Sequence, residues 1–337
     1  MVDQPPYDLR HRPLRDLRIS VTDRCNFRCT YCMPRAVFGD DYPFLPRREI
    51  LDFEEIARLA AIFTGLGVRK IRLTGGEPLL RRELHRLIEM IVAIPGIDDI
   101  ALTTNGSLLA EKANLLRSSG LNRVTVSLDS LDERTFAAMT DARYSAAKVI
   151  AGIEAAAAAG FAPVKINMVV KRGVNDHEVV PMARRFAGPK YILRFIEYMD
   201  VGNSNGWRMD DVVPAAEIID RLGRELKIEP LPANYRSEVA RRFRMEGGGE
   251  IGLITSVTQP FCGNCSRARL SSEGRLYTCL FAGEGHDLRN PLRSGASDGE
   301  IADLLRRIWG QRDDRYSEIR NSAPPHLHKA EMSMLGG

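Results

Sequence analysis

The stretch Cys25-Asn-Phe-Arg-Cys29-Thr-Tyr-Cys32 contains three of the six cysteines of this chain, separated by three and then by two residues. A loop this short can direct three thiolates at one small inorganic centre. A [4Fe–4S] cluster normally takes four cysteine ligands, so a set of three leaves one iron without a protein ligand. The spacing therefore predicts an iron–sulfur cluster with one iron open to a ligand from outside the chain.

Three other interpretations of this loop are less favourable. A structural zinc site needs a fourth protein ligand, and the nearest histidine, His11, lies well upstream. Disulfide pairing among three such closely spaced cysteines leaves one of them over. Buried structural cysteines are the third alternative, but the Asn, Arg, Thr and Tyr residues between them are not typical of a core. The metal-cluster interpretation is therefore favoured.

The size and composition of the chain bound the remaining possibilities. Its 337 residues suffice for one large domain, or for one with a smaller partner, and 44% hydrophobic and 27% charged residues are ordinary for a globular protein. Residues 1–8 lack the features of a signal peptide, and no apolar run of about 18 residues predicts a membrane span. Cysteines in two groups fit reduced metal ligands, so we expect a cytoplasmic protein. The net charge of +4 is too small to indicate nucleic-acid binding.

Short apolar segments alternate with longer helical segments from about residue 15 to residue 200. The expected strands are 15–21, 69–74, 98–103, 122–128, 163–170 and 191–197, and the expected helices are 48–65, 80–94, 107–119, 145–159 and 176–187. Six such units predict an α/β fold, an incomplete (β/α)6 TIM-like barrel. Beyond residue 200 we expect a helix at 214–223 and strands within 226–256. The predicted domains are therefore 1–225, the barrel, and 226–337, a smaller C-terminal α+β domain.

Four of the expected strands carry polar side chains on one face, although buried parallel strands are normally apolar on both faces. These polar residues are Arg18, Ser20, Thr22, Lys70, Arg72, Thr74, Thr125, Ser127, Asp129, Lys165 and Asn167. We infer that the apolar faces meet the helices and that the polar faces line a wet lumen. Its cations, with Arg194 from the sixth strand, would favour an anionic ligand such as a triphosphate, unless each of them pairs with a carboxylate.

A second cysteine group lies near the C-terminus. Cys262 and Cys265 are followed by Arg267-Ala268-Arg269 and, thirteen residues after Cys265, by a third cysteine, Cys279. Half a zinc ribbon is one interpretation, with His286 as the nearest candidate for a fourth ligand. The other interpretation is a second cluster with three cysteine ligands and its own open iron.

Several of these motifs together resemble a known family. The first cysteine loop, with Tyr31 before its third cysteine, resembles the cluster loop of radical S-adenosylmethionine (SAM) enzymes. The turn Thr74-Gly-Gly-Glu-Pro78 is similar to the element that holds the SAM amino group in that superfamily. The segments 17–25 and 33–34, the lumen cations, the second cysteine group and the terminal Gly336-Gly337 narrow the resemblance to the GTP 3′,8-cyclases of molybdenum cofactor biosynthesis.

The resemblance implies two [4Fe–4S] clusters and a radical reaction. At the first cluster, SAM would chelate the open iron, and electron transfer would cleave it to a 5′-deoxyadenosyl radical. The radical would abstract hydrogen from ribose C3′ of GTP, and the resulting carbon radical would attack C8 of guanine. The product would be (8S)-3′,8-cyclo-7,8-dihydroguanosine 5′-triphosphate. The second cluster would bind the guanine base.

The resemblance also implies roles for individual residues. SAM contacts are expected from Tyr31, Gly76, Ser127 and Met199. Nucleotide contacts are expected from Arg18, Arg72, Thr103, Lys165, Arg267, Ala268 and Arg269, together with the lumen cations Lys70 and Arg194. The cluster ligands would be Cys25, Cys29, Cys32, Cys262, Cys265 and Cys279. Gly336 and Gly337 would reach into the active site and be needed for turnover.

The expected partners are GTP, an electron donor of unknown identity and, by pathway, the downstream cyclic pyranopterin monophosphate synthase. A homodimer is a candidate assembly, and we expect neither a membrane nor a nucleic acid as a partner. Two alternatives stay open at this point. One is a radical SAM enzyme that modifies peptides and carries an auxiliary cluster, and the other is a zinc-dependent nucleic-acid-binding protein.

Overall fold

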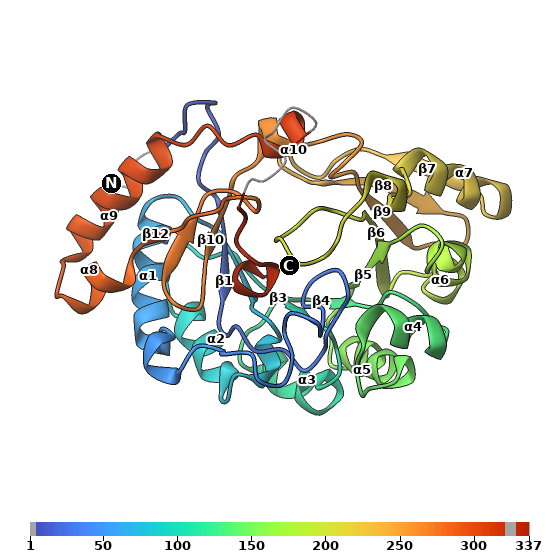
Figure 1. The fold of residues 1–337 in the computed structure, drawn as a ribbon, viewed down its shortest axis with the longest axis horizontal. Coiled ribbons are helices and arrows are strands. Elements are labelled where there is room, and N and C mark those ends of the chain that lie inside the picture. Colours follow the sequence, from blue (N-terminus) through green and yellow to red (C-terminus); the bar gives the residue numbers. More distant parts are fainter. Residues whose placement is uncertain (1–4, 321–327, 337) are drawn as a thin grey trace.

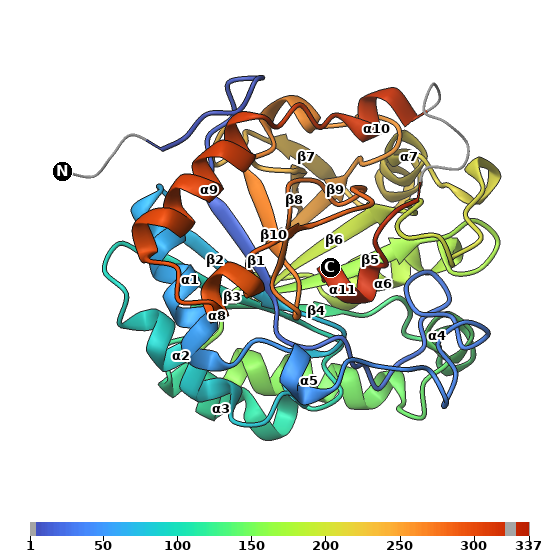
Figure 2. The ribbon, with the colours of Figure 1, turned by 60° about the vertical axis from the view of Figure 1, so that its left-hand side comes forward.

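Six parallel strands form the centre of the fold in a computed structural model, which describes residues 5–320 and 328–336. The strands lie next to one another in chain order: β1 (Asp16–Ser20), β2 (Lys70–Thr74), β3 (Asp99–Thr104), β4 (Arg123–Ser127), β5 (Val164–Val170) and β6 (Tyr191–Glu197). Figures 1 and 2 show that the sheet is curved and that helices lie along its outer side. The six predicted strand–helix units are therefore confirmed.

The outer layer consists of the helices that follow these strands. They are α1 (Phe53–Gly65), α2 (Leu84–Val92), α3 (Leu109–Ser118), α4 (Glu133–Thr140), α5 (Ala146–Ala158), α6 (Val179–Arg185) and α7 (Ala215–Glu225). α4 is a short helix that the sequence pattern did not predict. α1 begins later than predicted because the side chain of Asp52 accepts from Glu55 N while the side chain of Glu55 accepts from Asp52 N. This capping box fixes the first turn of α1.

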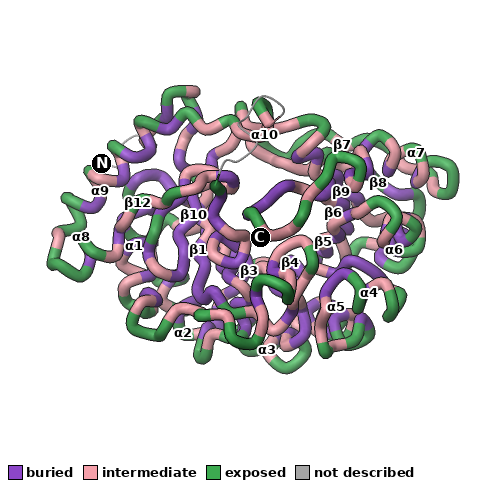
Figure 3. Tube along the Cα trace, in the orientation of Figure 1, coloured by how far each residue is buried: buried purple, intermediate pink, exposed green. Residues whose placement is uncertain are grey.

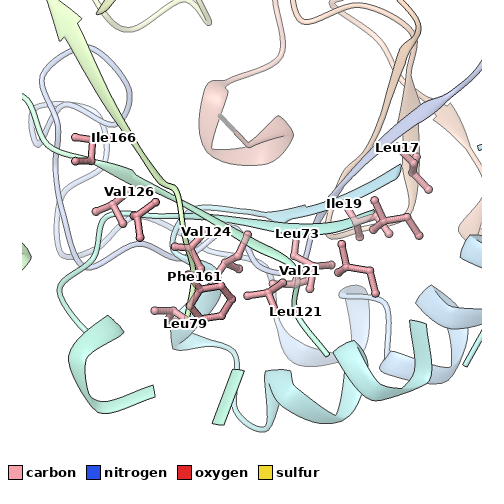
Figure 4. Packing of buried hydrophobic residues seen from close by; sticks show 14 of the residues in the cluster. Leu17, Ile19, Val21, Leu73, Leu79, Leu121, Val124, Val126, Phe161 and Ile166 are labelled. Carbon is pink, nitrogen blue, oxygen red and sulfur yellow. The ribbon is translucent and has the colours of Figure 1, made fainter. Parts of the chain in front are cut away.

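The apolar faces of the strands pack against these helices, as predicted. Leu17 and Ile19 of β1, Leu73 of β2 and Val124 and Val126 of β4 are fully buried. Figure 4 shows these side chains pointing from the sheet toward the helices, and Figure 3 shows that buried positions follow the strands. The burial of this apolar surface is the main driving force for folding.

The C-terminal part of the chain extends the same sheet at both edges. β9 (Glu250–Ile254) lies parallel to β6, and β8 (Ala240–Met245) and β7 (Ile228–Leu231) continue that edge in antiparallel pairing. At the other edge, β10 (Arg267–Leu270) lies parallel to β1, followed by β11 (Arg275–Tyr277) and β12 (His286–Asp287). The strands predicted within 226–256 are confirmed. The division into domains at residue 225 stays a prediction.

Further helices lie in the described C-terminal part of the chain: α8 (Arg289–Arg293), α9 (Asp298–Gly310), α10 (Tyr316–Ile319) and α11 (Met332–Leu335). α9 packs beside α1 on the outer side of the sheet, whereas α11 contacts β1 and lies on the inner side (Figure 2). In the described part of the chain, no helix combines the length and the apolar character that crossing a bilayer requires.

Candidate active site

A cavity of about 280 Å³ lies on the inner side of the curved sheet, and all six cysteines line it. All six are free thiols. The topology explains how two groups so far apart in the sequence meet at one cavity. The first group follows the carboxyl end of β1, whereas Cys262 and Cys265 precede the amino end of β10, which is parallel to β1. The cavity therefore runs along the strands from one cysteine group to the other.

The first cysteine loop is held in shape by hydrogen bonds within its own segment. Cys32 N and Met33 N both donate to the carbonyl oxygen of Cys29, at 3.0 and 2.8 Å. The Arg28 guanidinium donates to the carbonyl oxygens of Cys25 at 2.8 Å and of Phe38 at 2.6 Å. The loop is thus folded back on itself, with its three cysteines at the wall of the cavity.

Buried carboxylates lie close to these three thiols. Burial, followed by the charge of Glu77, raises the pKa of Cys25 to about 12. Burial and the charge of Asp129 raise the pKa of Cys29 well above its usual value. Protonated thiols are poor ligands, but a metal centre supplies the positive charge that deprotonates them. The carboxylates at this end of the cavity therefore favour a positively charged partner.

A glycine turn at the carboxyl end of β2 braces this loop. Gly76 N donates to the Thr22 carbonyl oxygen and Glu77 N to that of Arg24, both at 2.8 Å. A methyl group at Gly76 would collide with the Arg24 carbonyl group, so this close approach of two backbones requires glycine. From the sequence, we expected the glycines of this turn to allow a ligand to approach the backbone closely. In the structure, they also let the turn pack against the segment that leads to Cys25.

Tyr31 is oriented by a buried carboxylate on the polar side of the sheet. Its hydroxyl group donates to Asp129 Oδ2 at 2.7 Å, and the backbone N–H of Val169 donates to Asp129 Oδ1 at 2.9 Å. Burial raises the pKa of Asp129 to about 6. Asp129 therefore fixes the aromatic ring next to Cys32 with respect to β5.

The predicted cations line the middle of the cavity and a smaller adjoining cavity of about 70 Å³. Arg72 donates to the hydroxyl groups of Thr103 at 3.0 Å and Thr125 at 3.2 Å rather than to a carboxylate. Lys70 does meet carboxylates, since Asp16 and Asp99 each lie 3.8 Å from its Nζ atom. The alternative of carboxylate pairing thus applies to Lys70. Within the described residues, it does not apply to Arg72.

Crowding of these cations shows in their pKa values. Burial lowers the pKa of Lys165 to about 7, and the charge of Arg194 is the next cause. Burial lowers the pKa of Arg194 itself to about 9, with the charge of Arg72 next. Like charges held together in a buried site are relieved by an anion. The site therefore suits a ligand with several negative charges.

Arginines surround the second cysteine group. Arg267 Nη2 lies 3.2 Å from Cys265 Sγ. Burial raises the pKa of Cys265, but the charges of Arg267 and Arg312 outweigh burial and lower the pKa to about 6. Burial raises the pKa of Cys279 to about 11. At least one thiol of this group is therefore prepared for ligation by the charges of the chain itself.

Two families match the chain. Residues 19–186 match the Radical SAM superfamily, and residues 191–318 match the family described as Molybdenum Cofactor Synthesis C. A GTP 3′,8-cyclase of Acidothermus cellulolyticus is 54% identical to this chain, over 99% of each of the two chains. The chain belongs to the GTP 3′,8-cyclase family. A GTP 3′,8-cyclase of Xanthomonas axonopodis pv. citri is 50% identical over 99% of each chain.

One solved structure resembles the fold of this chain over most of the chain's length. SuiB of Streptococcus suis, bound to S-adenosylmethionine, superposes with a TM-score of 0.61 at 15% sequence identity. The superposition covers 92% of this chain and 68% of SuiB. At this identity the likeness concerns the fold.

Most of the residues predicted from the resemblance lie at the cavity. Those predicted for SAM all line it: Tyr31, Gly76, Ser127 and Met199. So do most of those predicted for the nucleotide: Arg18, Arg72, Thr103, Arg194, Arg267 and Arg269. Lys70 and Lys165 line the adjoining smaller cavity. The side chain of Ala268 points the other way, into the hydrophobic core, and lines neither cavity. Which ligand each residue contacts stays a prediction.

The predicted C-terminal tail enters the inner side of the sheet. Gly336 has a φ of +69° and lies so close to Thr74 that a methyl group there would collide with the threonine hydroxyl. Glycine is required for both reasons. Gly336 thus touches the end of β2 that carries the glycine turn. Gly337 lies outside the described residues.

The sequence interpretation missed several residues at this site. Arg12 and Arg312 line the cavity beside the second cysteine group. Each is a single arginine among 48 basic residues and stands in no motif, so no local signal distinguishes it. Asp129 was visible on the polar face of β4, but its contact with Tyr31 depends on the fold.

The zinc alternatives receive no support from the geometry. His286 lies in β12 and is not among the residues that line the cavity. Within residues 5–320 and 328–336, no three His, Cys, Asp or Glu side chains are grouped so that they could hold a single metal ion. All six cysteines line the cavity.

Proposed function

We propose that this protein cyclises GTP to (8S)-3′,8-cyclo-7,8-dihydroguanosine 5′-triphosphate, an early step of molybdenum cofactor biosynthesis. One observation carries the proposal: a single cavity joins two groups of three free cysteines to a set of buried cations. Membership of the GTP 3′,8-cyclase family supports it. A peptide substrate would not need this set of buried cations, and a nucleic-acid duplex would need an open basic surface rather than a cavity of this size.

We further propose a [4Fe–4S] cluster at each cysteine group, with SAM at the first. When bound at Cys25, Cys29 and Cys32, the first cluster would supply the electron that releases a 5′-deoxyadenosyl radical from SAM. Tyr31, Gly76, Ser127 and Met199 would hold SAM, since all four lie at the cavity wall. The open position at the second group would take the guanine base.

The residues of this chain would position and neutralise the nucleotide. Arg18 and Arg72 lie between the two cysteine groups along the strands, and Lys165 lies on β5 across the lumen. They would pair with the triphosphate while Arg267 and Arg269 hold the nucleotide near the second group. Fixing the ribose between the two ends of the cavity would confine the radical to one carbon–hydrogen bond. The enclosed site would also exclude water from the radical.

The test is anaerobic incubation of the reconstituted protein with reductant, SAM and each of several nucleoside triphosphates. We expect 5′-deoxyadenosine only with GTP, together with a nucleotide product of unchanged mass and altered chromatographic retention. The product should be consumed by cyclic pyranopterin monophosphate synthase, the proposed downstream partner. Formation of 5′-deoxyadenosine with every nucleotide alike would remove GTP as the substrate. No cleavage of SAM with both clusters intact would overturn the radical reaction.

A further inference from the structure

The segment before β1 carries no sequence motif, yet it reaches the second cysteine group. Asp8 and Arg12 are 4% and 2% exposed, which is unusual for charged residues. Both belong to one turn, in which Asp8 Oδ1 accepts from the backbone N–H groups of Arg10 and Arg12 at 2.9 Å. Buried charges need partners, so the contacts of this turn show what it holds.

The two guanidinium groups that meet Asp8 each hold one end of the Cys262–Cys265 turn. Arg12 Nε donates to Asp8 Oδ2 at 2.6 Å, and its Nη1 donates to the Cys262 carbonyl oxygen at 2.8 Å. From the other side, Arg312 Nη1 donates to Asp8 Oδ2 at 3.1 Å and to the Cys265 carbonyl oxygen at 2.8 Å. A single carboxylate thus ties together two arginines that grip the backbone of both cysteines. We call Asp8, Arg12 and Arg312 the clamp.

The clamp is fixed to the rest of the fold by α9. Trp309 Nε1 donates to the Arg12 carbonyl oxygen at 3.0 Å, and the guanidinium of Arg312 lies 4.6 Å from the centre of the Trp309 ring. Arg12 Nη1 also donates to the Asp314 carbonyl oxygen at 2.7 Å. The clamp therefore has little freedom to rearrange when the cavity is filled.

One donor of the clamp has no partner. Arg12 Nη2 is buried and makes no hydrogen bond to any described residue, and Arg12 lines the cavity together with the second cysteine group. Leaving a buried charged donor unpaired is unfavourable. Thiolate and sulfide sulfur atoms accept hydrogen bonds from N–H donors. An anionic centre held by Cys262, Cys265 and Cys279 would supply the missing acceptor.

We propose that the clamp positions Cys262 and Cys265 and that Arg12 Nη2 donates a hydrogen bond to the anionic centre that the second cysteine group holds. This rests on the second cluster of the proposed function. Arg312 also pairs with Asp314, whose Oδ2 atom lies 3.2 Å from Arg312 Nε, so Asp8 and Asp314 together balance the two arginines of the clamp. The Arg12 guanidinium nevertheless directs an unpaired donor and its positive charge at the centre, and positive charge stabilises the reduced, more negative form of a cluster, so Arg12 raises its reduction potential.

The test measures the second cluster alone, in full-length protein whose Cys25, Cys29 and Cys32 are replaced by serine. The reduction potential is read by electron paramagnetic resonance during redox titration, and the rate of iron loss is measured with a chelator. Arg12→Gln should shift the potential to a more negative value and accelerate iron loss. Asp8→Asn should shift the potential in the opposite direction, because it removes the negative charge that Arg12 and Arg312 share and leaves Asp314 as the carboxylate partner of Arg312.

Opposite shifts of the reduction potential distinguish the clamp from a merely structural contact. Loss of a structural contact would not make the direction of the shift depend on the sign of the charge removed. Arg12→Lys should restore most of the potential but not the resistance to the chelator, because one ammonium group cannot make all three contacts. Arg10→Gln is the control, since Arg10 lies in the same turn and pairs with Asp313 at the surface. Unchanged potentials in both Arg12→Gln and Asp8→Asn would overturn the clamp. Absence of any cluster in the triple-serine protein before these changes would instead overturn the second cluster itself.

Discussion

The two cysteine groups line one cavity, but carboxylates are the main charges that act on Cys25 and Cys29, whereas guanidinium groups are the main charges that act on Cys265. Carboxylates lie near the first group, where Glu77 and Asp129 raise the thiol pKa values in addition to burial. Guanidinium groups lie near the second, where Arg267 and Arg312 lower the pKa of Cys265 to about 6 against the effect of burial. Similar sets of three cysteines therefore stand in different electrostatic fields.

This difference matches the charges of the two proposed ligands. SAM is a sulfonium cation with an ammonium group, and carboxylates near the first group favour it. GTP is a polyanion, and the arginines of β10 and the lumen favour it. We therefore expect charge to orient both molecules in the cavity. Substitutions at either end of the cavity should therefore affect SAM and GTP differently.

Replacing one cysteine should remove one cluster and leave the other in place. In Cys29→Ser the first cluster should be lost and the second kept, and in Cys265→Ser the reverse, because each group has its own set of ligands. We expect about half of the wild-type iron in each variant, and no cyclised product from either. Iron analysis and electron paramagnetic resonance of anaerobically reconstituted protein measure this. Loss of both signals in a single variant would show that the groups do not hold separate clusters.

A methyl group on the tail should stop turnover without removing either cluster. Gly336→Ala must displace the tail from Thr74, since the added carbon collides with that side chain and the backbone φ of +69° disfavours alanine. A small displacement at a reacting site can lower the rate by roughly a hundredfold. Product formation per cluster measures the effect.

The matched control is Gly223→Ala in α7, where a methyl group meets no other atom and should leave turnover unchanged. A chain that ends at Leu335 should behave like Gly336→Ala, with both clusters bound and no product. Wild-type turnover in either tail variant would show that Gly336 is not needed for the reaction.

Removing one guanidinium group from β10 should weaken the binding of GTP far more than the binding of SAM. Arg267→Gln and Arg269→Gln each lose a charge beside the second cysteine group, and a charge-assisted hydrogen bond of about 1.5–3 kcal/mol corresponds to at least a tenfold loss of GTP affinity. Equilibrium binding of GTP and of SAM measures both. Arg275→Gln on the adjacent strand is the control, because Arg275 is exposed and pairs with Glu273. Unchanged GTP affinity in both β10 variants would favour a peptide-modifying enzyme.

Sequence reasoning succeeded where the signal was local. The alternation of polar and apolar residues placed Arg18 and Arg72 at the cavity because it follows from the geometry of a single strand. The same rule applies to Ala268, which lies between two cavity arginines and therefore faces the core. The helix α9 was not predicted, although Ser297 and Glu300 form a capping box, a local signal, before its apolar face.

What the sequence could not show depends on contacts between distant segments. The pairing of β10 with β1 brings the second cysteine group to the first, and no local pattern specifies which strand becomes a neighbour. Asp8, Arg12 and Arg312 acquire their role only when the N-terminal segment and the end of α9 meet at Cys262 and Cys265. Isolated charged residues of this kind carry no spacing rule.

The smallest predicted effect concerns Lys165, which lines the smaller cavity. Its pKa of about 7 in the free protein, lowered by burial and by Arg194, should rise when a triphosphate binds beside it. GTP then binds the protonated lysine better, so affinity is full below about pH 7 and falls as the pH rises above it. The terminal phosphate is largely ionised over this range and adds little to the change.

Titration calorimetry between about pH 7 and pH 9, in buffers with different ionisation enthalpies, should detect proton uptake on GTP binding and an affinity loss of up to about tenfold per pH unit. Lys165→Met should bind more weakly at pH 7 and show a shallower dependence, with the rest due to Lys70, whose pKa is about 8 mainly because of burial. Lys148→Met, an exposed lysine on α5, should follow the wild type. A wild-type affinity that is flat above pH 7 would show that the triphosphate lies elsewhere. The division of charge between the two cysteine groups would then have to orient the nucleotide without the lumen cations.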